Sequence, residues 1–584
     1  MGVGDRELGP TVWAQERRQP AGFENYPAKG KNMHTMSLNS RNFGKVSGSR
    51  WRAANLCTKL AASVLAIGFA SCGAAQEATH PDPASYGLDP ETGVFTHPEA
   101  APFYAYSGPR RFEGSLEALD DKTYIKNMKV EAQWPIVVKP GHSWQHTVDM
   151  DGSRYMIHYY RHILKIYDIT NPKELEIILE KTYEDGEWFG AASIAFNEEL
   201  QKWIMIQSFE VPRSIGGLKG KKYDSPEAVE AIKNAKAFRG VRIYEMDSIT
   251  EWTQIAEIST NTLNPHGTKQ EGSGALDVPN YNGGKYAFIT AAPDNTFTNI
   301  EYPNYIYSPA QMILDVEDPY NPKWVSTWWV PGQRLGEEKQ YKEWRQYGNR
   351  VSWTGARLPI STPVPLDEGG KYGYTVMGGL GFHVLDLEDP ANPTALGSID
   401  LPVNVGGVEG DNIDVTRVES RGIVLANGYP MNEDCYEPYK DIYVIDVSTP
   451  DAPEIISTLP RPTPPKEAAF TDFCQRLGKF GPKRPTPFFA PGEADENLAI
   501  YPFNNAGVQI FDITDPMNAT IAAYFIPPMT DDLNDPRSYI TPVESIFVEW
   551  DRNLIWAFAN SGMYLLSADV LGEPNFGPVD PIQN

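Results

Sequence analysis

The sequence has few cysteines, few long helical stretches and too few basic residues to balance its acidic ones. Four cysteines in 584 residues are too few for a fold that disulfides hold together. The 51 lysine and arginine residues face 76 aspartate and glutamate residues, which gives a formal net charge of −25. Such a surface repels nucleic acids and anionic membranes, so we expect no nucleic-acid partner.

Long hydrophobic runs are also missing. The apolar run near the N-terminus, Leu60–Ala70, is about half as long as a membrane-spanning helix needs to be. It follows three basic residues, Arg50, Arg52 and Lys59, and precedes small residues. This is the pattern of a secretory signal peptide. The sequence therefore predicts export to the periplasm, the outer membrane or the outside of the cell.

The end of this signal has two interpretations. The sequence FASCG resembles a bacterial lipoprotein box with phenylalanine in place of leucine, and it would put a lipid anchor on Cys72. Cleavage after Ala75 by an ordinary signal peptidase is the alternative. We assign residues 1–75 to the N-terminal extension and signal peptide, and residues 76–126 to a linker or arm. Membrane contact is expected only through the lipid anchor.

A repeated phrase organises the rest of the chain. A run of β-branched and aliphatic residues ends at an aspartate, and an Asp-Pro or Asn-Pro turn follows, as in GFHVLDLEDPANP at 381–393. Aspartate side chains accept hydrogen bonds from the backbone N–H groups of such turns, and proline stops a strand. We therefore predict a structural role for the aspartates that end these runs. They are Asp168, Asp315, Asp386, Asp446 and Asp512.

Each repeat divides into four short strands separated by turns, which is typical of one blade of a β-propeller. Two degenerate repeats carry Glu245 and Ser567 where the others carry aspartate. The sequence therefore predicts an all-β fold in which residues 127–584 form a single β-propeller of about seven four-stranded blades. The last repeat lacks a fourth strand, and Asn127–Val138 would supply it and close the ring.

The repeated phrase resembles that of the LVIVD-repeat family of β-propeller proteins. The likeness covers roughly Gly141–Val570 and is carried by GFHVLDLEDPANPTALGSIDL and its sibling phrases. The resemblance implies a propeller that is secreted or attached to a bacterial cell envelope. It implies no particular reaction, so a function must be argued from a site.

Long loops are expected on one face of the propeller. If the strands alternate in direction, the loops that follow second and fourth strands share a face, and several of these loops are long. They are Ser208–Gly240, Ala292–Pro309, Pro331–Pro359 and Arg461–Phe489. Long insertions confined to one face are typical of a functional face. Within the loop Ser208–Gly240, the sequence of residues 225–238 predicts a short helix.

The innermost strands of the blades begin at this same face, and several of them begin with charged or histidine residues. We predict that these residues converge on the mouth of the central channel; solvated channel lining is the alternative interpretation. The candidate catalytic residues are His146, Glu271, Arg357, Glu409 and Glu544. The candidate binding residues are His142, His266 and Arg476.

His142 and His146 are also candidate ligands of a divalent or transition metal. Residues four apart on a strand lie about 13 Å from each other, so the pair binds one ion only if the chain turns between them. Mixed histidine and carboxylate sets suit zinc, iron or copper, and the remaining ligands would come from His266, Glu271 and Glu409. The other histidines of the repeats are expected to be structural; these are His158, His162 and His383.

Cys435 and Cys474 lie in loops after the second and fourth strands of one blade, so both fall on the long-loop face. Their pairing is geometrically permitted, and they form a candidate disulfide if the protein is exported.

Two functions fit these patterns. The first is a monomeric binding protein of the cell envelope that holds a small molecule, a glycan or a protein at the mouth of the channel. The alternative is an enzyme, namely a hydrolase, a lyase or a metal-dependent oxidoreductase, that uses the histidine, glutamate and arginine residues at the same mouth. The sequence has no G-x-S-x-G or H-E-x-x-H motif and no phosphate-binding loop between a strand and a helix. We favour the binding protein.

Overall fold

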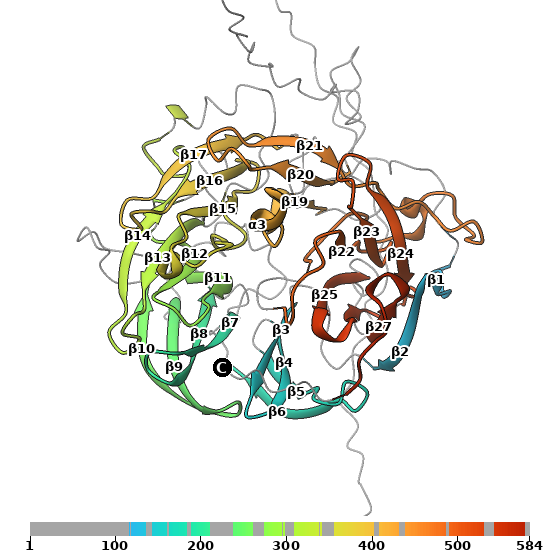
Figure 1. Ribbon diagram of the computed structural model, residues 1–584, viewed down its shortest axis with the longest axis horizontal. Coiled ribbons are helices and arrows are strands. Elements are labelled where there is room, and N and C mark those ends of the chain that lie inside the picture. The colour runs from blue at the N-terminus through green and yellow to red at the C-terminus, as the bar shows by residue number, and fades with distance from the viewer. Residues whose placement is uncertain are drawn as a thin grey trace, which may run out of the picture. The chain divides into compact units, whose positions relative to one another are not determined.

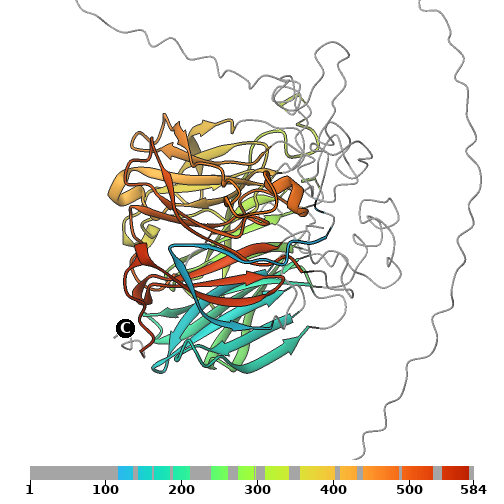
Figure 2. The same cartoon turned by 90° about the vertical axis from the view of Figure 1, so that its right-hand side faces the viewer.

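The computed structural model shows a β-propeller of seven blades arranged in a ring (Figure 1), which confirms the predicted fold class. Seen from the side, the strands run between the two faces of the ring (Figure 2). The structure describes residues 116, 118–135, 143–160, 163–183, 188–210, 238–260, 274–294, 296–297, 309–337, 339–340, 355–401, 408–430, 439–485, 490–530 and 542–577.

The first three blades are each built from four consecutive antiparallel strands. Blade 1 contains β3 (Ser143–Met150), β4 (Ser153–Tyr160), β5 (Ile163–Asp168) and β6 (Glu176–Thr182). Blade 2 contains β7 (Trp188–Asn197), β8 (Lys202–Glu210), β9 (Gly240–Ser248) and β10 (Glu251–Ser259). Blade 3 contains β11 (Gly274–Asn280), β12 (Tyr286–Ala292), β13 (Ala310–Asp315) and β14 (Lys323–Trp328).

Blades 4 and 5 continue the ring. Blade 4 contains β15 (Tyr372–Val376), β16 (Phe382–Asp386) and β17 (Thr394–Ile399), and the 3-10 helix η3 (Leu366–Glu368) precedes it. Its inner edge is occupied by the segment around Ser361, which pairs with Tyr374. Blade 5 contains β18 (Val408–Asp414), the single turn α3 (Val418–Arg421), β19 (Ile423–Tyr429), β20 (Ile442–Asp446) and β21 (Glu454–Thr458).

Blades 6 and 7 complete the ring. Blade 6 contains β22 (Leu498–Pro502), β23 (Val508–Asp512) and β24 (Thr520–Ile526), and the 3-10 helix η4 (Phe473–Arg476) precedes it. Blade 7 contains β25 (Val543–Glu549), η5 (Trp550–Arg552), β26 (Leu554–Ala559), β27 (Gly562–Ala568) and η6 (Asp569–Leu571). In the part of the chain that the structure describes, no helix is long and apolar enough to cross a membrane.

Strands from the start of the described chain close the ring. β2 (Met128–Trp134) pairs with β27 and is the fourth strand of blade 7, which confirms the prediction for this segment. β1 (Tyr124–Lys126) pairs with β24 at the outer edge of blade 6, which the sequence did not indicate. Between them Asn127 has a φ of 53°, a conformation that asparagine tolerates, and the chain steps from one blade to the next there. Both strands, in blue, lie beside red strands of the last two blades in Figure 1.

The aspartates of the repeated phrase have the predicted structural role. Each accepts a hydrogen bond from the backbone N–H two residues later, at 2.8 to 3.1 Å, as Asx-turns require. They are Asp168, Asp315, Asp386, Asp446 and Asp512. In three of the turns a second aspartate also accepts a hydrogen bond from the side chain of the asparagine three residues later. The motif D-P-x-N, which all three turns share, therefore corresponds to a double turn.

The hydrophobic core lies between neighbouring blades. The third strands are almost fully buried, as in β20, whereas outer strands such as β6 and β21 are partly exposed. Where the ring closes, Met156 and Tyr167 of blade 1 pack against Phe547 and Trp556 of blade 7. The apolar side chains of each blade are therefore buried by its neighbours in the ring.

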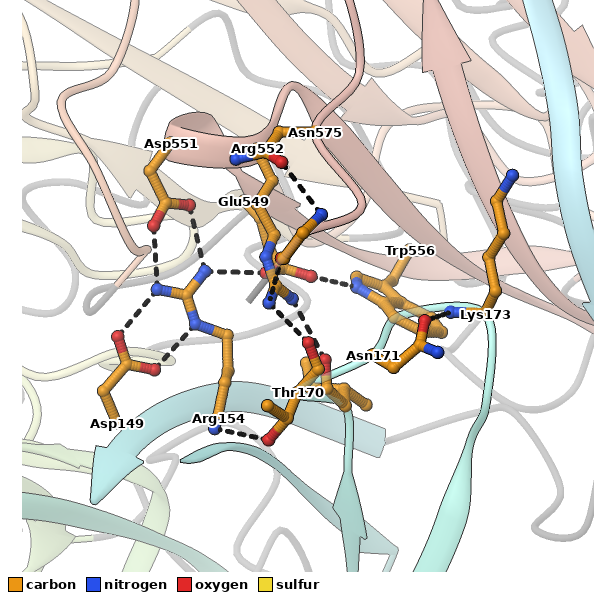
Figure 3. A network of polar contacts seen from close by, with 12 residues as sticks. Asp149, Arg154, Thr170, Asn171, Lys173, Glu549, Asp551, Arg552, Trp556 and Asn575 are labelled. Carbon is orange, nitrogen blue, oxygen red and sulfur yellow. Dashed lines mark hydrogen bonds and ion pairs between the residues drawn. The ribbon is translucent and has the colours of Figure 1, made fainter. Parts of the chain in front are cut away.

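A buried group of ion pairs and hydrogen bonds joins the same two blades (Figure 3). We call it the clasp, and it consists of Asp149, Arg154, Glu549, Asp551 and Arg552. The Arg154 guanidinium of blade 1 binds Asp149 of its own blade at 2.7 Å, and it binds Glu549 and Asp551 of blade 7 at 2.7 and 2.8 Å. Arg552 donates to Glu549 at 3.2 Å and to main-chain carbonyl oxygens of blade 1. The Arg154 side chain is 1% exposed, so these carboxylates, and not water, stabilise its positive charge.

We expect Arg154→Met to lower the free energy of unfolding by about 3–5 kcal/mol, because it leaves buried carboxylates without their partner. Urea denaturation of the full chain measures the loss. The matched control is Lys371→Met, which removes one member of an exposed pair with Glu388 and should cause no measurable change. Equal stability of the two variants would contradict a role for the clasp in closing the ring.

Candidate functional site

The long loops attach to one face of the ring, as predicted. They follow β8, β12, β14 and β21, which are second or fourth strands of their blades, and antiparallel pairing brings the ends of such strands to the same face. We call this the long-loop face. Much of the long loops, including the predicted helix at 225–238, lies outside the described residues.

Charged side chains from three adjacent blades meet around Asp411, on the innermost strand of blade 5. Lys483 Nζ donates to one carboxylate oxygen of Asp411 at 2.7 Å, and Arg357 Nε donates to the other at 3.1 Å. Arg357 lies in the segment at the inner edge of blade 4, and the backbone N–H of Lys483 donates to Pro502 O at the end of β22 in blade 6. The carboxylate therefore connects the innermost segments of three blades.

The burial of Asp411 is unusual for a carboxylate and is matched by its partners. Its exposed fraction is 1%. Burial alone would raise the pKa of Asp411, but the positive charges of Lys483, Arg357 and Arg484 lower it to about 2. Asp411 is therefore ionised throughout the physiological range. It acts as a fixed negative charge that positions the cations and cannot serve as a proton donor.

Two lysines contact one tyrosine beside this carboxylate. Tyr429, at the end of β19, accepts a hydrogen bond from Lys479 Nζ. The ammonium groups of Lys479 and Lys483 lie 4.3 and 3.5 Å from the centroid of the tyrosine ring. Lys483 therefore touches both Tyr429 and Asp411. We call Asp411, Tyr429, Arg357, Lys479, Lys483 and Arg484 the mouth cluster.

Glycines allow the backbone to bring these segments together. A Cβ atom on Gly410 would lie 3.0 Å from the Cβ of Val376, so glycine lets β18 approach blade 4 and places Asp411 near Arg357. Gly481 has a φ of 153° and packs against Pro430, while Asn504 Nδ2 donates to its carbonyl at 2.8 Å. The lysine segment is thereby fixed against the ends of β19 and β22.

Among the predicted catalytic and binding residues, Arg357 joins the mouth cluster. Glu409 and Glu544 lie on β18 and β25, the innermost strands of blades 5 and 7, but their side chains are not described. Arg484 pairs with Ser545, the residue after Glu544, so blade 7 also borders the cluster. The predicted residues outside the described part of the chain are His142, His266, Glu271 and Cys435.

His146, another predicted catalytic residue, lies apart from the mouth cluster, between blades 1 and 2. Its side chain is 2% exposed and contacts the hydroxyl of Tyr159, which also donates to Ala192 O at 2.6 Å. Burial lowers the pKa of His146 to about 3, so the ring is neutral and belongs to the interior between blades 1 and 2. Within the described ranges, no three His, Cys, Asp or Glu side chains form a group able to hold a metal ion.

Arg476 also has a different role from the predicted one. It is fully buried in η4, where Nε donates to Asp120 Oδ2 at 2.8 Å and the other nitrogens donate to the carbonyls of Asn505 and Pro527. The backbone N–H of Leu116 donates to the neighbouring Gln475 carbonyl at 3.0 Å. Arg476 therefore attaches the N-terminal arm to blade 6.

Two of the three histidines predicted to be structural lie in the described interior. His158 packs against Tyr167 and Phe558, and His383 Nε2 contacts Leu380 O at 2.8 Å. Burial lowers the pKa of His158 to about 3 and that of His383 to about 4. His162 lies outside the described residues.

Cys474, in η4, is disulfide-bonded. Its sulfur also lies 3.7 Å from the hydroxyl of Tyr439. The remaining cysteines all lie outside the described residues, so the pairing of Cys474 with Cys435 stays a prediction.

Sequence reasoning missed five members of the mouth cluster, namely Asp411, Tyr429, Lys479, Lys483 and Arg484. Two signals were present. Asp411 lies two residues after Glu409 on the same strand, and such residues share a face in regular strand geometry. The segment RLGKFGPKR contains four basic residues and no acidic one, which is unusual in a chain of this net charge.

No protein-family model and no curated protein sequence matches the chain. Similar solved structures include the β-propeller domain of Cps50 (Swd1) from Myceliophteria thermophila, with 10% identity, a TM-score of 0.39 and coverage of 76% of this chain and 99% of that one. The periplasmic gluconolactonase PpgL of Pseudomonas aeruginosa has 10% identity, a TM-score of 0.38 and coverage of 72% and 94%. Sqt1 of Saccharomyces cerevisiae has 7% identity, a TM-score of 0.35 and coverage of 72% and 81%. These likenesses carry no information about function.

We expect Asp411→Asn to lower the free energy of unfolding by about 3–5 kcal/mol, because the buried cations lose their shared carboxylate. Asp441→Asn is the control, since Asp441 binds the half-exposed Arg461 and its loss should cost at most about 1 kcal/mol. Urea denaturation compares the variants. A second substitution, Lys483→Met, should recover part of the loss in Asp411→Asn; a further loss of similar size would contradict the coupling of the two residues.

The three buried histidines predict a loss of stability in mild acid. Their pKa values of about 3, 3 and 4 lie below the 6.5 of an exposed histidine, so below about pH 6.5 the unfolded chain takes up protons that the folded protein does not. From pH 7 to pH 5 each histidine should cost roughly 2 kcal/mol. Asp411 titrates only at lower pH and does not contribute in this window. Urea midpoints at the two pH values test this, and His383→Gln should reduce the difference by about a third; an unchanged midpoint would contradict it.

Proposed function

We propose that the protein is an exported β-propeller that binds a small molecule with an anionic group at its mouth cluster. The observation that carries the proposal is the convergence of Arg357 of one segment, and of Lys483 and Arg484 of another, on one buried carboxylate of blade 5. Elsewhere in the ring, neighbouring blades are held together by apolar packing and by ion pairs such as that of Arg154 with Glu549.

The charges of the cluster favour an anionic ligand. The whole chain has a net charge of −25, yet the mouth cluster contains four cationic side chains beside Asp411. A local positive field on an acidic protein attracts anions to that place. Guanidinium groups also match the planar fork of a carboxylate or two oxygens of a phosphate. The ligand class is therefore a small carboxylate or phosphate compound.

Arg357 is the residue that a ligand would reach most easily. Its side chain is 12% exposed, whereas those of Lys483 and Asp411 are 0% and 1% exposed. One guanidinium nitrogen is held by Asp411, which fixes the direction of the group. We expect Arg357 to be the principal donor to the ligand.

Two observations support export. The N-terminal region contains the basic, apolar and small-residue pattern of a signal peptide around Leu60–Ala70. Cys474 is disulfide-bonded, and disulfides persist mainly in oxidising compartments. The resemblance to LVIVD-repeat proteins favours the same location.

The proposal is tested by titrating the full chain with inorganic phosphate and with citrate in a calorimeter, against sodium chloride of the same ionic strength. Arg357→Gln should weaken the binding of the preferred anion about tenfold or more, because it removes a charged hydrogen-bond donor. The control is Arg461→Gln, which lies outside the cluster and pairs with Asp441. Absence of binding to both anions, or equal affinities of the two variants, would overturn the proposal.

An enzyme at the same cluster is the second candidate function. One specific observation favours it, namely the contact of Tyr429 with two lysines. Ammonium groups beside a phenol are a means of making it an acid–base group.

A further inference from the structure

We propose that Tyr429 is an acid–base residue whose hydroxyl is ionised by the two lysines that contact it, and that it accepts a proton from the bound ligand. The inference goes beyond binding, because it assigns proton transfer to the mouth cluster. It rests on the position of Tyr429 among charged groups that come from several segments of the chain.

Lys479 and Lys483 place positive charge on both the oxygen and the ring of Tyr429. Lys479 Nζ donates a hydrogen bond to the phenol oxygen and lies 4.3 Å from the ring centroid. Lys483 Nζ lies 3.5 Å from the same centroid. A hydrogen bond to the charged form and a nearby opposite charge both favour the phenolate over the neutral phenol.

Burial opposes ionisation, and other tyrosines of the propeller show this effect. Burial raises the pKa of Tyr281 and of Tyr374 to about 12. Tyr429 is equally buried, with 1% of its surface exposed, but it is in contact with two ammonium groups. A buried site has a low effective dielectric constant, so these contacts act more strongly on Tyr429 than they would in water. The lysines therefore offset the effect of burial.

The other charged groups near Tyr429 are part of the same cluster. From β18, Asp411 shares Lys483 with the tyrosine and disfavours a second negative charge. Arg357, from the segment before blade 4, and Arg484, next to Lys483, lower the pKa of Asp411 and so favour negative charge at this place. Glu409 lies next to Val408, whose backbone pairs with that of Tyr429. Lys479 adds a further positive charge, and it donates directly to the phenol oxygen.

The chemistry that follows is a simple proton abstraction. The phenolate oxygen of Tyr429 forms an O–H bond with an acidic proton of the ligand, and the electron pair of the broken O–H or C–H bond stays on the ligand. Arg357 is placed to stabilise the negative charge that develops there. Return of the proton to the product restores the phenolate, so no other reactant is consumed by Tyr429. Lys479 and Lys483 are positioning residues in this scheme.

The test is a spectrophotometric titration of tyrosinate absorbance in the full chain, without ligand. Its outcome is therefore independent of whether the anions proposed above bind. The wild-type chain should show about one tyrosine ionising at least roughly one pH unit below the ordinary value of about 10. Tyr429→Phe, which keeps the ring and its packing, should lose this step. The control Tyr372→Phe, at an exposed position, should keep it.

A second variant tests the lysines. Lys479→Met should move the early ionisation to higher pH while circular dichroism shows an unchanged fold, an effect that a merely structural lysine would not have. If the titration of Tyr429→Phe coincides with that of the wild type at low and neutral pH, the proposal is overturned. If Tyr429→Phe removes the step and Lys479→Met does not move it, the role given to Lys479 is overturned.

Discussion

The structure depends on one strand pairing, that of β2 with β27. In a propeller each blade buries its two apolar faces against its neighbours, so an open ring leaves a complete face exposed at each end. Here the N-terminal strand completes the last blade, and Met156 and Tyr167 of the first blade then pack against Phe547 and Trp556 of the last. The mouth cluster exists only in this closed ring, because it needs blades 4, 5 and 6 held at fixed spacing around the channel.

Buried arginines define how neighbouring elements meet. Arg154 binds carboxylates of blade 7, Arg417 of blade 5 donates to main-chain carbonyls before and within β22, and Arg476 joins the N-terminal arm to blade 6. The apolar faces of the blades resemble one another, so they distinguish poorly between correct and shifted packing. A guanidinium that loses its buried acceptors is costly, and correct packing is the arrangement that provides them. The arginines therefore contribute specificity where the apolar contacts are repetitive.

Most of the fold could be predicted from the sequence, because the repeated phrase records a local hydrogen-bond pattern. Asp386 and its equivalents reveal turns that depend on neighbouring residues alone, and counting the turns gives the blades. The closing strand β2 could be found because one repeat lacked its fourth strand. β1 could not, because three residues contain no usable periodicity and its place is set by blade 6.

The candidate site could be predicted only in part. Arg357 was found from its place before a blade, but the sequence does not say whether a side chain on an inner segment faces the channel or the next blade. His146 and Arg476 turn to the interior for this reason, and Asp411 was passed over in favour of Glu409. Lys483 and Tyr429 meet through tertiary packing between segments that lie 50 or more residues apart in the chain, which local patterns do not record.

The closing strand also determines the order in which the molecule can form. Met128 pairs with Ala568, so β2, from the start of the described chain, waits for almost the whole chain before it finds its partner. Contacts between such distant residues form slowly, because the entropy of a very long loop must be lost first. Until then the chain is an open arc with an unpaired strand edge and two exposed apolar faces, which is the species most prone to aggregate. The open arc therefore persists until the last blade is available to pair with β2.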